Sequence, residues 1–187
     1  MLGVLAAVLA SAVAGAAGSS STIVTVVRPF DHGVPRAGLR ITATYKGSCA
    51  GGSDATDRLD AWRCGFGNLL IDPCFSDPTG GVAYVLCLRR PWGTETIKLV
   101  VTGTRGPNTT RRAPTGHPWG IQLRTGARCL FVQGASSELH GVRLNYTCSD
   151  GSVLYGDVRR GQPWTILRAT GDDAEVTRRA AIARVWF

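Results

Sequence analysis

The chain has 187 residues, 44% of them hydrophobic, and its 21 Lys and Arg against 13 Asp and Glu give a formal net charge of +8. This length and apolar content allow a domain with a packed core, so they exclude a small scaffold held together only by disulfides. A basic exported body could meet acidic wall polymers, anionic lipid headgroups or an acidic protein, but the interpretation that we favour is a solvated, soluble surface.

The segment from Met1 to about Ser21 carries no charged side chain. Its apolar stretch 2–10 has the length of a signal-peptide core, and Ala-x-Ala cleavage patterns follow at 12–14 and 14–16. No basic residue precedes this core, so either the true start lies upstream or the leader is atypical. A retained membrane anchor is the alternative, although the small and polar stretch 15–22 is unfavourable for a spanning helix. We therefore predict a leader over residues 1–21 and a single extracytoplasmic β domain over residues 22–187.

The six cysteines indicate disulfides, because their number is even and an export leader precedes them. No Cys-x-x-Cys occurs, which favours structural bridges over a zinc site or a redox pair. Short and turn-rich spacings favour the pairs Cys49–Cys64, Cys74–Cys87 and Cys129–Cys148. An exchange of partners among the first four cysteines is the alternative.

Short alternating segments rich in β-branched and aromatic residues predict strands along most of the chain. They lie near 22–28, 39–45, 82–88, 96–102, 119–124, 129–133, 142–147, 152–158, 164–169 and 180–186. One short helix is expected over Asp54–Trp62, with Ser53 as its N-cap. The expected fold class is all-β and mostly antiparallel, a disulfide-stabilised sandwich or small barrel with one short helix.

A pair of arginines followed by Pro-Trp and then by a predicted strand occurs three times in the sequence. The tryptophans of this pattern are Trp92, Trp119 and Trp164. The functional interpretation is a binding surface for a polymer or sugar, formed by Trp92, Trp119, Trp164, Arg89, Arg90, Arg159 and Arg160. The structural interpretation is three core tryptophans at strand starts with solvated arginines, and we favour it because Trp buries a large apolar area. The remaining pair of arginines, Arg111 and Arg112, precedes Trp119.

Candidate chemistry is sparse. Asp54, Asp57 and Asp60 would share one side of the expected helix and are weak calcium candidates, although the EF-hand pattern is absent. The histidines form no zinc-binding pattern and no Gly-x-Ser-x-Gly elbow occurs, so we name no catalytic or cofactor-binding residue and expect no cofactor.

Two sets of motifs resemble uncharacterised secreted proteins of actinobacteria and related high-GC bacteria. The first set is Gly47-Ser48-Cys49, Asp60-Ala61-Trp62-Arg63-Cys64, Gly67-Asn68, Asp72-Pro73-Cys74-Phe75 and Cys87; the second is Pro118-Trp119, Gly126, Cys129, Gly134-Ala135, Gly141, Asn145-Tyr146-x-Cys148, Gly156 and Trp164. The resemblance covers about residues 47–165 and implies an extracytoplasmic disulfide-bonded module. It brings no activity and no binding residues.

These observations favour an exported, non-catalytic module of the cell envelope or extracellular space that binds a protein or an acidic wall component. An extracellular hydrolase with an unmarked active site is the second interpretation, and a purely structural or secreted effector protein is the third. Nucleic acid is an unexpected partner outside the cytoplasm, and a membrane is expected only if the leader is retained.

We predict that the mature N-terminus lies between Gly15 and Ser19, because the Ala-x-Ala patterns follow a short apolar core. N-terminal sequencing of the exported protein checks this. Exported protein that still begins at Met1 would indicate a retained anchor instead.

Overall fold

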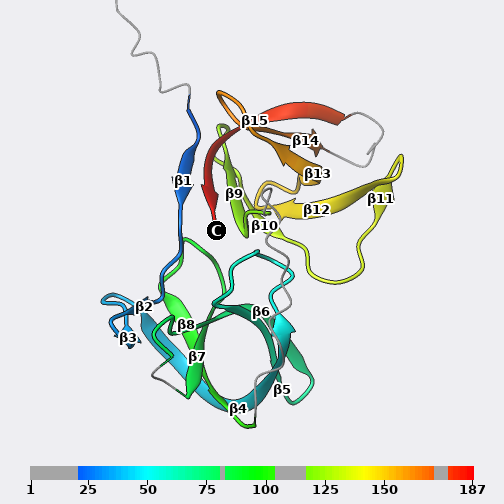
Figure 1. The fold of residues 1–187 in the computed structure, drawn as a ribbon. Helices are drawn as coiled ribbons and strands as arrows, with labels where there is room; N and C mark the ends of the chain where they lie inside the picture. The colour runs from blue at the N-terminus through cyan, green and yellow to red at the C-terminus, as the bar shows by residue number, and fades with distance from the viewer. Residues whose placement is uncertain (1–20, 81–82, 104–116, 171–176) are drawn as a thin grey trace, which may run out of the picture.

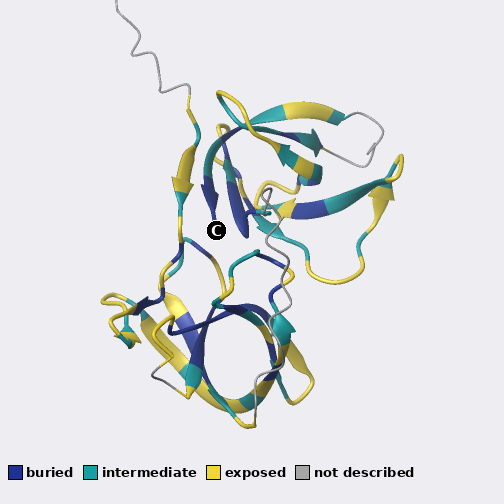
Figure 2. Cartoon of the chain, viewed as in Figure 1, coloured by how far each residue is buried: buried dark blue, intermediate teal, exposed yellow. Residues whose placement is uncertain are grey.

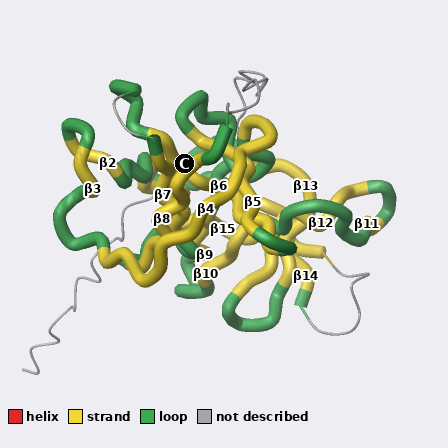
Figure 3. The backbone as a smooth tube through the Cα atoms, turned by 90° about the horizontal axis from the view of Figure 1, so that it is seen from below, coloured by secondary structure: helices red, strands yellow, loops and turns green. Residues whose placement is uncertain are grey.

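The computed structural model describes residues 21–80, 83–103, 117–170 and 177–187 (Figure 1). Over these ranges the only regular elements are β-strands, and no helix is present (Figure 3). The all-β prediction is therefore confirmed, while the expected helix over Asp54–Trp62 is wrong.

The first half of the chain forms a closed five-stranded barrel, seen as the ring in Figure 1. Four of its five strand pairings are antiparallel, and the parallel pairing of β4 with β8 closes the barrel. Its strands are β4 (Arg40–Gly52), β5 (Ala61–Phe66), β6 (Leu69–Ser76), β7 (Tyr84–Leu88) and β8 (Glu95–Val101). A small separate ribbon, β2 (Phe30–Asp31) with β3 (Val34–Pro35), precedes them.

The second half of the chain forms a sheet that also closes on itself, because β15 pairs with β9 as well as with β14. The order around this second barrel is β15, β14, β13, β12, β10 and β9, with β11 attached to β12 and β1 attached to β15. The strands are β1 (Ile23–Thr25), β9 (Gly120–Leu123), β10 (Arg128–Phe131), β11 (Glu138–Leu139), β12 (Val142–Cys148), β13 (Val153–Arg159), β14 (Thr165–Ala169) and β15 (Thr177–Trp186).

All three expected disulfides are present, and no cysteine is free. In each pair the two cysteines lie directly opposite one another on adjacent antiparallel strands. Cys49–Cys64 and Cys74–Cys87 reinforce the first barrel, and Cys129–Cys148 reinforces the second. Each bridge therefore fixes the register of one strand pair and also reduces the conformational freedom of the unfolded chain.

The expected helix is replaced by a loop. The Ser53 hydroxyl accepts hydrogen bonds from the backbone N–H groups of Ala55 (3.0 Å) and Thr56 (3.2 Å), as an N-cap would. The same hydroxyl donates to the Asp72 carboxylate, which also accepts the N–H of Asp54. These bonds tie the segment to β6, and β5 begins at Ala61, so the residues between Ser53 and Ala61 form a loop.

All ten expected strands are present, but β2, β3, β5, β6 and β11 were not predicted. The β5–β6 hairpin was missed because β6 contains Asp72-Pro73, and proline removes a ladder hydrogen bond. The pairing register shifts at this point, between Trp62 and Cys64 on the partner strand. This irregularity accommodates the proline in β6, which pairs with β5 on one side and with β7 on the other.

A hydrophobic cluster joins the two barrels. From the first barrel it contains Phe75 and Leu86, and from the second it contains Trp119 and Trp186. The rings of Phe75 and Trp119 lie 5.8 Å apart with a 54° tilt. Figure 2 shows buried segments where the barrels face one another. Each barrel also has its own apolar core besides this shared cluster.

We predict that Trp119→Ala destabilises the protein by about 3–5 kcal/mol, because Trp119 is only 3% exposed and packs between the barrels. We expect one cooperative unfolding transition, since the shared cluster couples the two barrels. Denaturant unfolding monitored by circular dichroism measures both quantities. Trp164→Ala is the control, and its loss should be smaller because Trp164 is half-buried; equal losses, or two separate transitions, would contradict the coupling.

Candidate functional site

A basic pocket of about 420 Å³ lies where the first barrel meets the second. We call it the interbarrel pocket, and its wall is formed by Arg89, Arg90, Trp92, Gly93, Thr94, Glu95 and Arg128. All but one of these residues come from the connection between β7 and β8 and the first residue of β8. Arg128 is the first residue of β10 in the second barrel.

The β7–β8 connection is held by a tight turn. The N–H of Gly93 donates to the carbonyl of Arg90 at 3.1 Å, and Pro91 is buried under the turn. Pro91 and Trp92 pack directly on the backbone of Gly120 in the second barrel. A Cβ atom at Gly120 would lie only 2.5 Å from Cγ of Pro91, so the close approach of the two barrels requires glycine at this position.

Trp92 forms the apolar wall of the pocket. Its ring lies 5.1 Å from that of Trp186, at an interplanar angle of 56°, so one side of the indole is anchored in the shared core. The guanidinium carbon of Arg128 lies 5.5 Å from the centre of the Trp92 ring. This geometry is that of a cation–π contact, which orients Arg128 toward the pocket.

The pocket carries an excess of positive charge. Among the described residues that line it, the one carboxylate is Glu95, which already pairs with Arg40 outside the pocket. Among the described residues no acidic side chain forms a salt bridge with Arg89, Arg90 or Arg128. All three arginines are exposed. The arrangement can therefore accept an anion beside an aromatic face.

The structure divides the predicted Trp/Arg surface. Trp92, Arg89 and Arg90 lie together in the interbarrel pocket, whereas Trp119 is buried in the shared core. Trp164 packs on the core of the second barrel.

The Trp164 corner is separate from this pocket. The guanidinium of its neighbour Arg160 stacks over the Trp164 ring at 5.0 Å, and Arg159 is exposed beside it. Arg111 and Arg112 lie outside the described residues. Sequence reasoning missed Arg128, because no motif marks it and only the pairing of β10 brings it to Trp92.

The three calcium candidates do not converge. Asp54 pairs with Arg63 at 2.8 Å, and Asp60 accepts a hydrogen bond from Arg58 Nε at 2.8 Å. Asp57 is half-buried, and burial raises the pKa of its carboxyl while nearby His117 lowers it in part. In the part of the chain that the structure describes, no three His, Cys, Asp or Glu side chains are placed to hold a metal ion.

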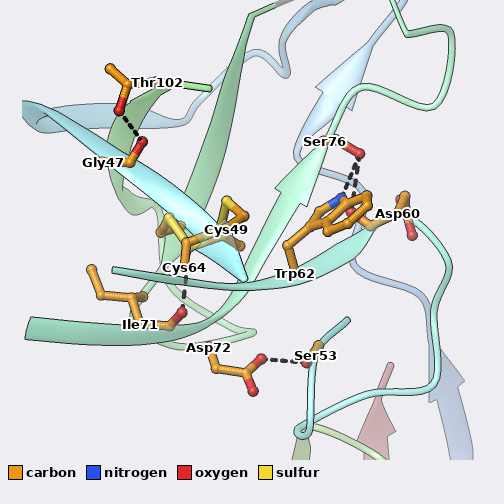
Figure 4. The surroundings of a disulfide bond; sticks show 12 residues. Gly47, Cys49, Ser53, Asp60, Trp62, Cys64, Ile71, Asp72, Ser76 and Thr102 are labelled. Atoms are coloured by element: carbon orange, nitrogen blue, oxygen red, sulfur yellow. Dashed lines mark hydrogen bonds between the residues drawn. A yellow bond between two sulfur atoms is a disulfide. The ribbon is translucent and has the colours of Figure 1, made fainter. Parts of the chain in front are cut away.

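In the loop between β4 and β5, polar contacts have a structural role (Figure 4). The Trp62 indole N–H donates to the Ser76 hydroxyl at 3.0 Å, and that hydroxyl in turn faces the carbonyl of Asp60 at 3.4 Å. Asp72 is 5% exposed, and its carboxylate accepts a hydrogen bond from the Ser53 hydroxyl. The side chains of Ser53, Asp72 and Ser76 therefore fix the loop to β5 and β6.

The histidines do not form a catalytic triad with the residues described. His32 and His140 occupy left-handed positions, with φ of 47° and 51°, at exposed turns. His117 lies 3.5 Å from the Asp157 carboxylate, but no hydrogen bond joins it to a Ser or Thr hydroxyl in the described ranges. Every cysteine is oxidised, which removes the thiol nucleophiles.

No protein-family model, curated protein or solved structure matches the chain. Three disulfides in an all-β fold fit an extracellular location, because such bridges persist in oxidising compartments. Residues 21–80, 83–103, 117–170 and 177–187 include no helix long and apolar enough to cross a membrane.

Two buried or hydrogen-bonded carboxyls have pKa values displaced in opposite directions. Burial raises the pKa of Asp72, and hydrogen bonds from Ser53 and from the N–H of Asp54 offset part of the effect. At Asp150, hydrogen bonds from Ser152 dominate and hold the pKa below its ordinary value. These displacements link the stability of the fold to pH.

We predict opposite pH dependences for the two carboxyls. Asp72 binds its proton more tightly in the folded state, so its stabilising contribution is complete below the unfolded pKa of about 4 and is lost as pH rises through the raised folded pKa. The contribution of Asp150 is present above about pH 4 and is lost as pH falls through the lowered folded pKa. Denaturant unfolding between about pH 3 and 7 measures the free energy of unfolding of wild type and of each variant. The advantage of wild type over Asp72→Asn should shrink as pH rises, whereas its advantage over Asp150→Asn should grow. Two slopes of the same sign would contradict this assignment.

Proposed function

We propose that the protein is an exported, non-catalytic module of the cell envelope or extracellular space, and that its interbarrel pocket binds an acidic partner. The partner is a carboxylate- or phosphate-bearing wall polymer or an acidic protein segment. The observation that carries the proposal is the grouping of Arg89, Arg90 and Arg128 around Trp92, with the one carboxylate of the pocket already paired elsewhere.

Export is supported by three independent features. Residues 1–21 have the composition predicted for a leader, the cysteines are all paired, and the motifs resemble those of secreted bacterial proteins. An oxidising compartment is where such bridges form and persist.

The chemistry of the pocket selects for anions. Arginine presents a planar fork of donors that matches carboxylate and phosphate groups in a bidentate manner. Two of the arginines come from adjacent positions on one turn, and the third comes from the other barrel, so they reach a ligand from different directions. Trp92 adds an aromatic face against which the apolar part of a sugar or peptide can pack.

A polymer or extended segment suits this site better than a buried small molecule. The three arginines are exposed, and the pocket opens on the surface between the barrels. Exposed cations attract a polyanion over a distance of about 10 Å at 0.1 M salt, which accelerates encounter and makes binding sensitive to ionic strength.

The hydrolase interpretation has less support. His117 and Asp157 lie close together, but the residues described around them supply no activated nucleophile, and the arginine pocket contains no histidine. A purely structural role would leave the arginines of the pocket without consequence for binding. Binding measurements on arginine variants therefore separate that role from the proposed one.

We predict that the double variant R89Q/R90Q weakens binding of poly-L-glutamate about tenfold or more, because it removes two guanidinium groups that each contribute charge-assisted hydrogen bonds. Titration calorimetry at about 0.1 M salt measures the affinity, and raising the salt concentration should weaken wild-type binding. Neutral dextran should not bind.

The variant R159Q/R160Q is the matched control, because it removes an adjacent pair of exposed arginines of the same total charge outside the pocket. It should change the affinity less than about twofold, as surface changes away from a site usually do. Equal losses in both double variants would show that binding follows net charge alone and would remove the pocket from the proposal. Absence of poly-L-glutamate binding in wild type would favour the structural role.

A further inference from the structure

A second arginine-lined cavity lies at one end of the second barrel. It is open to solvent, has a volume of about 660 Å³ and is lined by Leu123, Arg124, Thr125, Arg168, Thr170, Arg178, Arg179, Ala180 and Ala181. We call it the barrel-mouth cavity. These residues belong to the end of β9 and its turn, to β14 and the residue after it, and to the start of β15 (Figure 1).

The register of the sheet places two of the lining arginines on the face of β14 and β15 that covers the barrel core. Ile166 is fully buried in the barrel core, and Arg168 lies two residues further along β14, on the same face. Ala180 pairs with Ile166 and Arg178 pairs with Arg168, so these two residues of β15 also share that face. Arg168 and Arg178 therefore form a cationic rim above the apolar interior.

The base of the cavity is apolar. Leu123 is 1% exposed and belongs to the barrel core, and Ala180 packs against the same core. A cavity of this volume falls within the range of about 300–1,000 Å³ that is typical of small-molecule sites, and barrel mouths are among the places where such sites occur.

One arginine of the rim is held in a fixed orientation. Arg168 donates from Nε to the Ser152 hydroxyl at 3.0 Å and from one terminal nitrogen to the Asp150 carboxylate at 2.8 Å. Asp150 in turn accepts the N–H and the hydroxyl of Ser152. A guanidinium held in this way is preorganised, which lowers the entropy lost when a ligand binds.

The rim places like charges together. Arg168 and Arg178 are directly opposite on adjacent antiparallel strands, and like charges in that position are destabilising. Arg124 and Arg179 also line the cavity, and none of the described lining residues is a carboxylate. Asp150 compensates the charge of Arg168, whereas no carboxylate of the described residues forms a salt bridge with Arg178, so Arg178 is the rim cation that an anion can reach.

We propose that the barrel-mouth cavity is a binding site for a small organic oxyanion, a carboxylate or phosphate attached to an apolar group. The oxyanion lies between Arg178 and Arg168 at the rim, and the apolar group enters toward Leu123. This site is distinct from the interbarrel pocket, with which it shares no residue.

The test uses three probes that separate the two halves of the ligand: inorganic phosphate, phenyl phosphate and benzyl alcohol. Titration calorimetry of the wild-type protein should show phenyl phosphate binding about tenfold more tightly than inorganic phosphate, because the ring adds apolar contact. Benzyl alcohol should not bind. Equal affinity for the two phosphates would remove the apolar part of the proposal, and tighter binding of benzyl alcohol would overturn it.

R178Q should weaken phenyl phosphate binding about tenfold, since it removes one charged donor. The same variant should melt at a temperature equal to or slightly above that of wild type, because the repulsion with Arg168 is relieved. A structural role for Arg178 would instead lower the melting temperature. R159Q is the matched control, because it removes an exposed arginine outside the cavity. It should leave both the affinity for phenyl phosphate and the melting temperature unchanged.

Two further sets of substitutions locate the bound phenyl phosphate and test for a counter-ion within the chain. R89Q/R90Q should leave phenyl phosphate binding intact, and a loss of binding in that variant would assign the ligand to the interbarrel pocket.

The connection 171–176 lies outside the described residues and contains Asp172, Asp173 and Glu175. If phenyl phosphate binds only when these three are neutralised, the chain supplies its own counter-ions, and the proposed site for an external ligand is overturned.

Discussion

The packing of the two barrels against each other is the interaction on which the rest of the structure depends. Trp119 and Trp186 insert large apolar surfaces from the second barrel into a cluster that contains Phe75 from the first. Gly120 permits this contact by leaving room for Pro91. Without this interface each barrel would expose one end of its core, and the arginines of the first barrel would not lie opposite those of the second.

Closure and cross-linking explain how barrels of this size remain defined. Each barrel is closed by a pairing between strands that are distant in the sequence, β4 with β8 and β9 with β15. Closure removes most free sheet edges, which are otherwise sites of aggregation. The disulfides join residues that already face each other in the ladder, so they reinforce the register that the apolar alternation selects.

The excess of arginine is organised by this scaffold. The interbarrel pocket combines cations from both barrels with an exposed part of Trp92, while the barrel-mouth cavity combines cations with an apolar floor at Leu123. The first arrangement suits an extended acidic partner and the second suits a small amphiphilic anion. In both, a salt bridge engages one lining residue: Glu95 pairs with Arg40 in the first, and Arg168 pairs with Asp150 in the second. Such a concentration of like charge offers binding at the cost of electrostatic repulsion within the fold.

The sequence by itself determined the all-β class and ten of the strands, and it favoured the observed cysteine pairing, because two-residue alternation and short turn-rich spacings are local signals. It could not distinguish a sandwich from paired barrels, since closure depends on contacts such as β4 with β8 that lie far apart in the chain. The expected helix at Asp54–Trp62 failed for a similar reason: Ser53 has the local geometry of an N-cap, but Asp72, on another strand, holds it in a loop. The binding residues divide in the same way, because the Arg89-Arg90 corner is visible in the sequence. Arg128 joins that corner, and Arg178 comes to face Arg168, only when tertiary pairing brings distant strands to one surface.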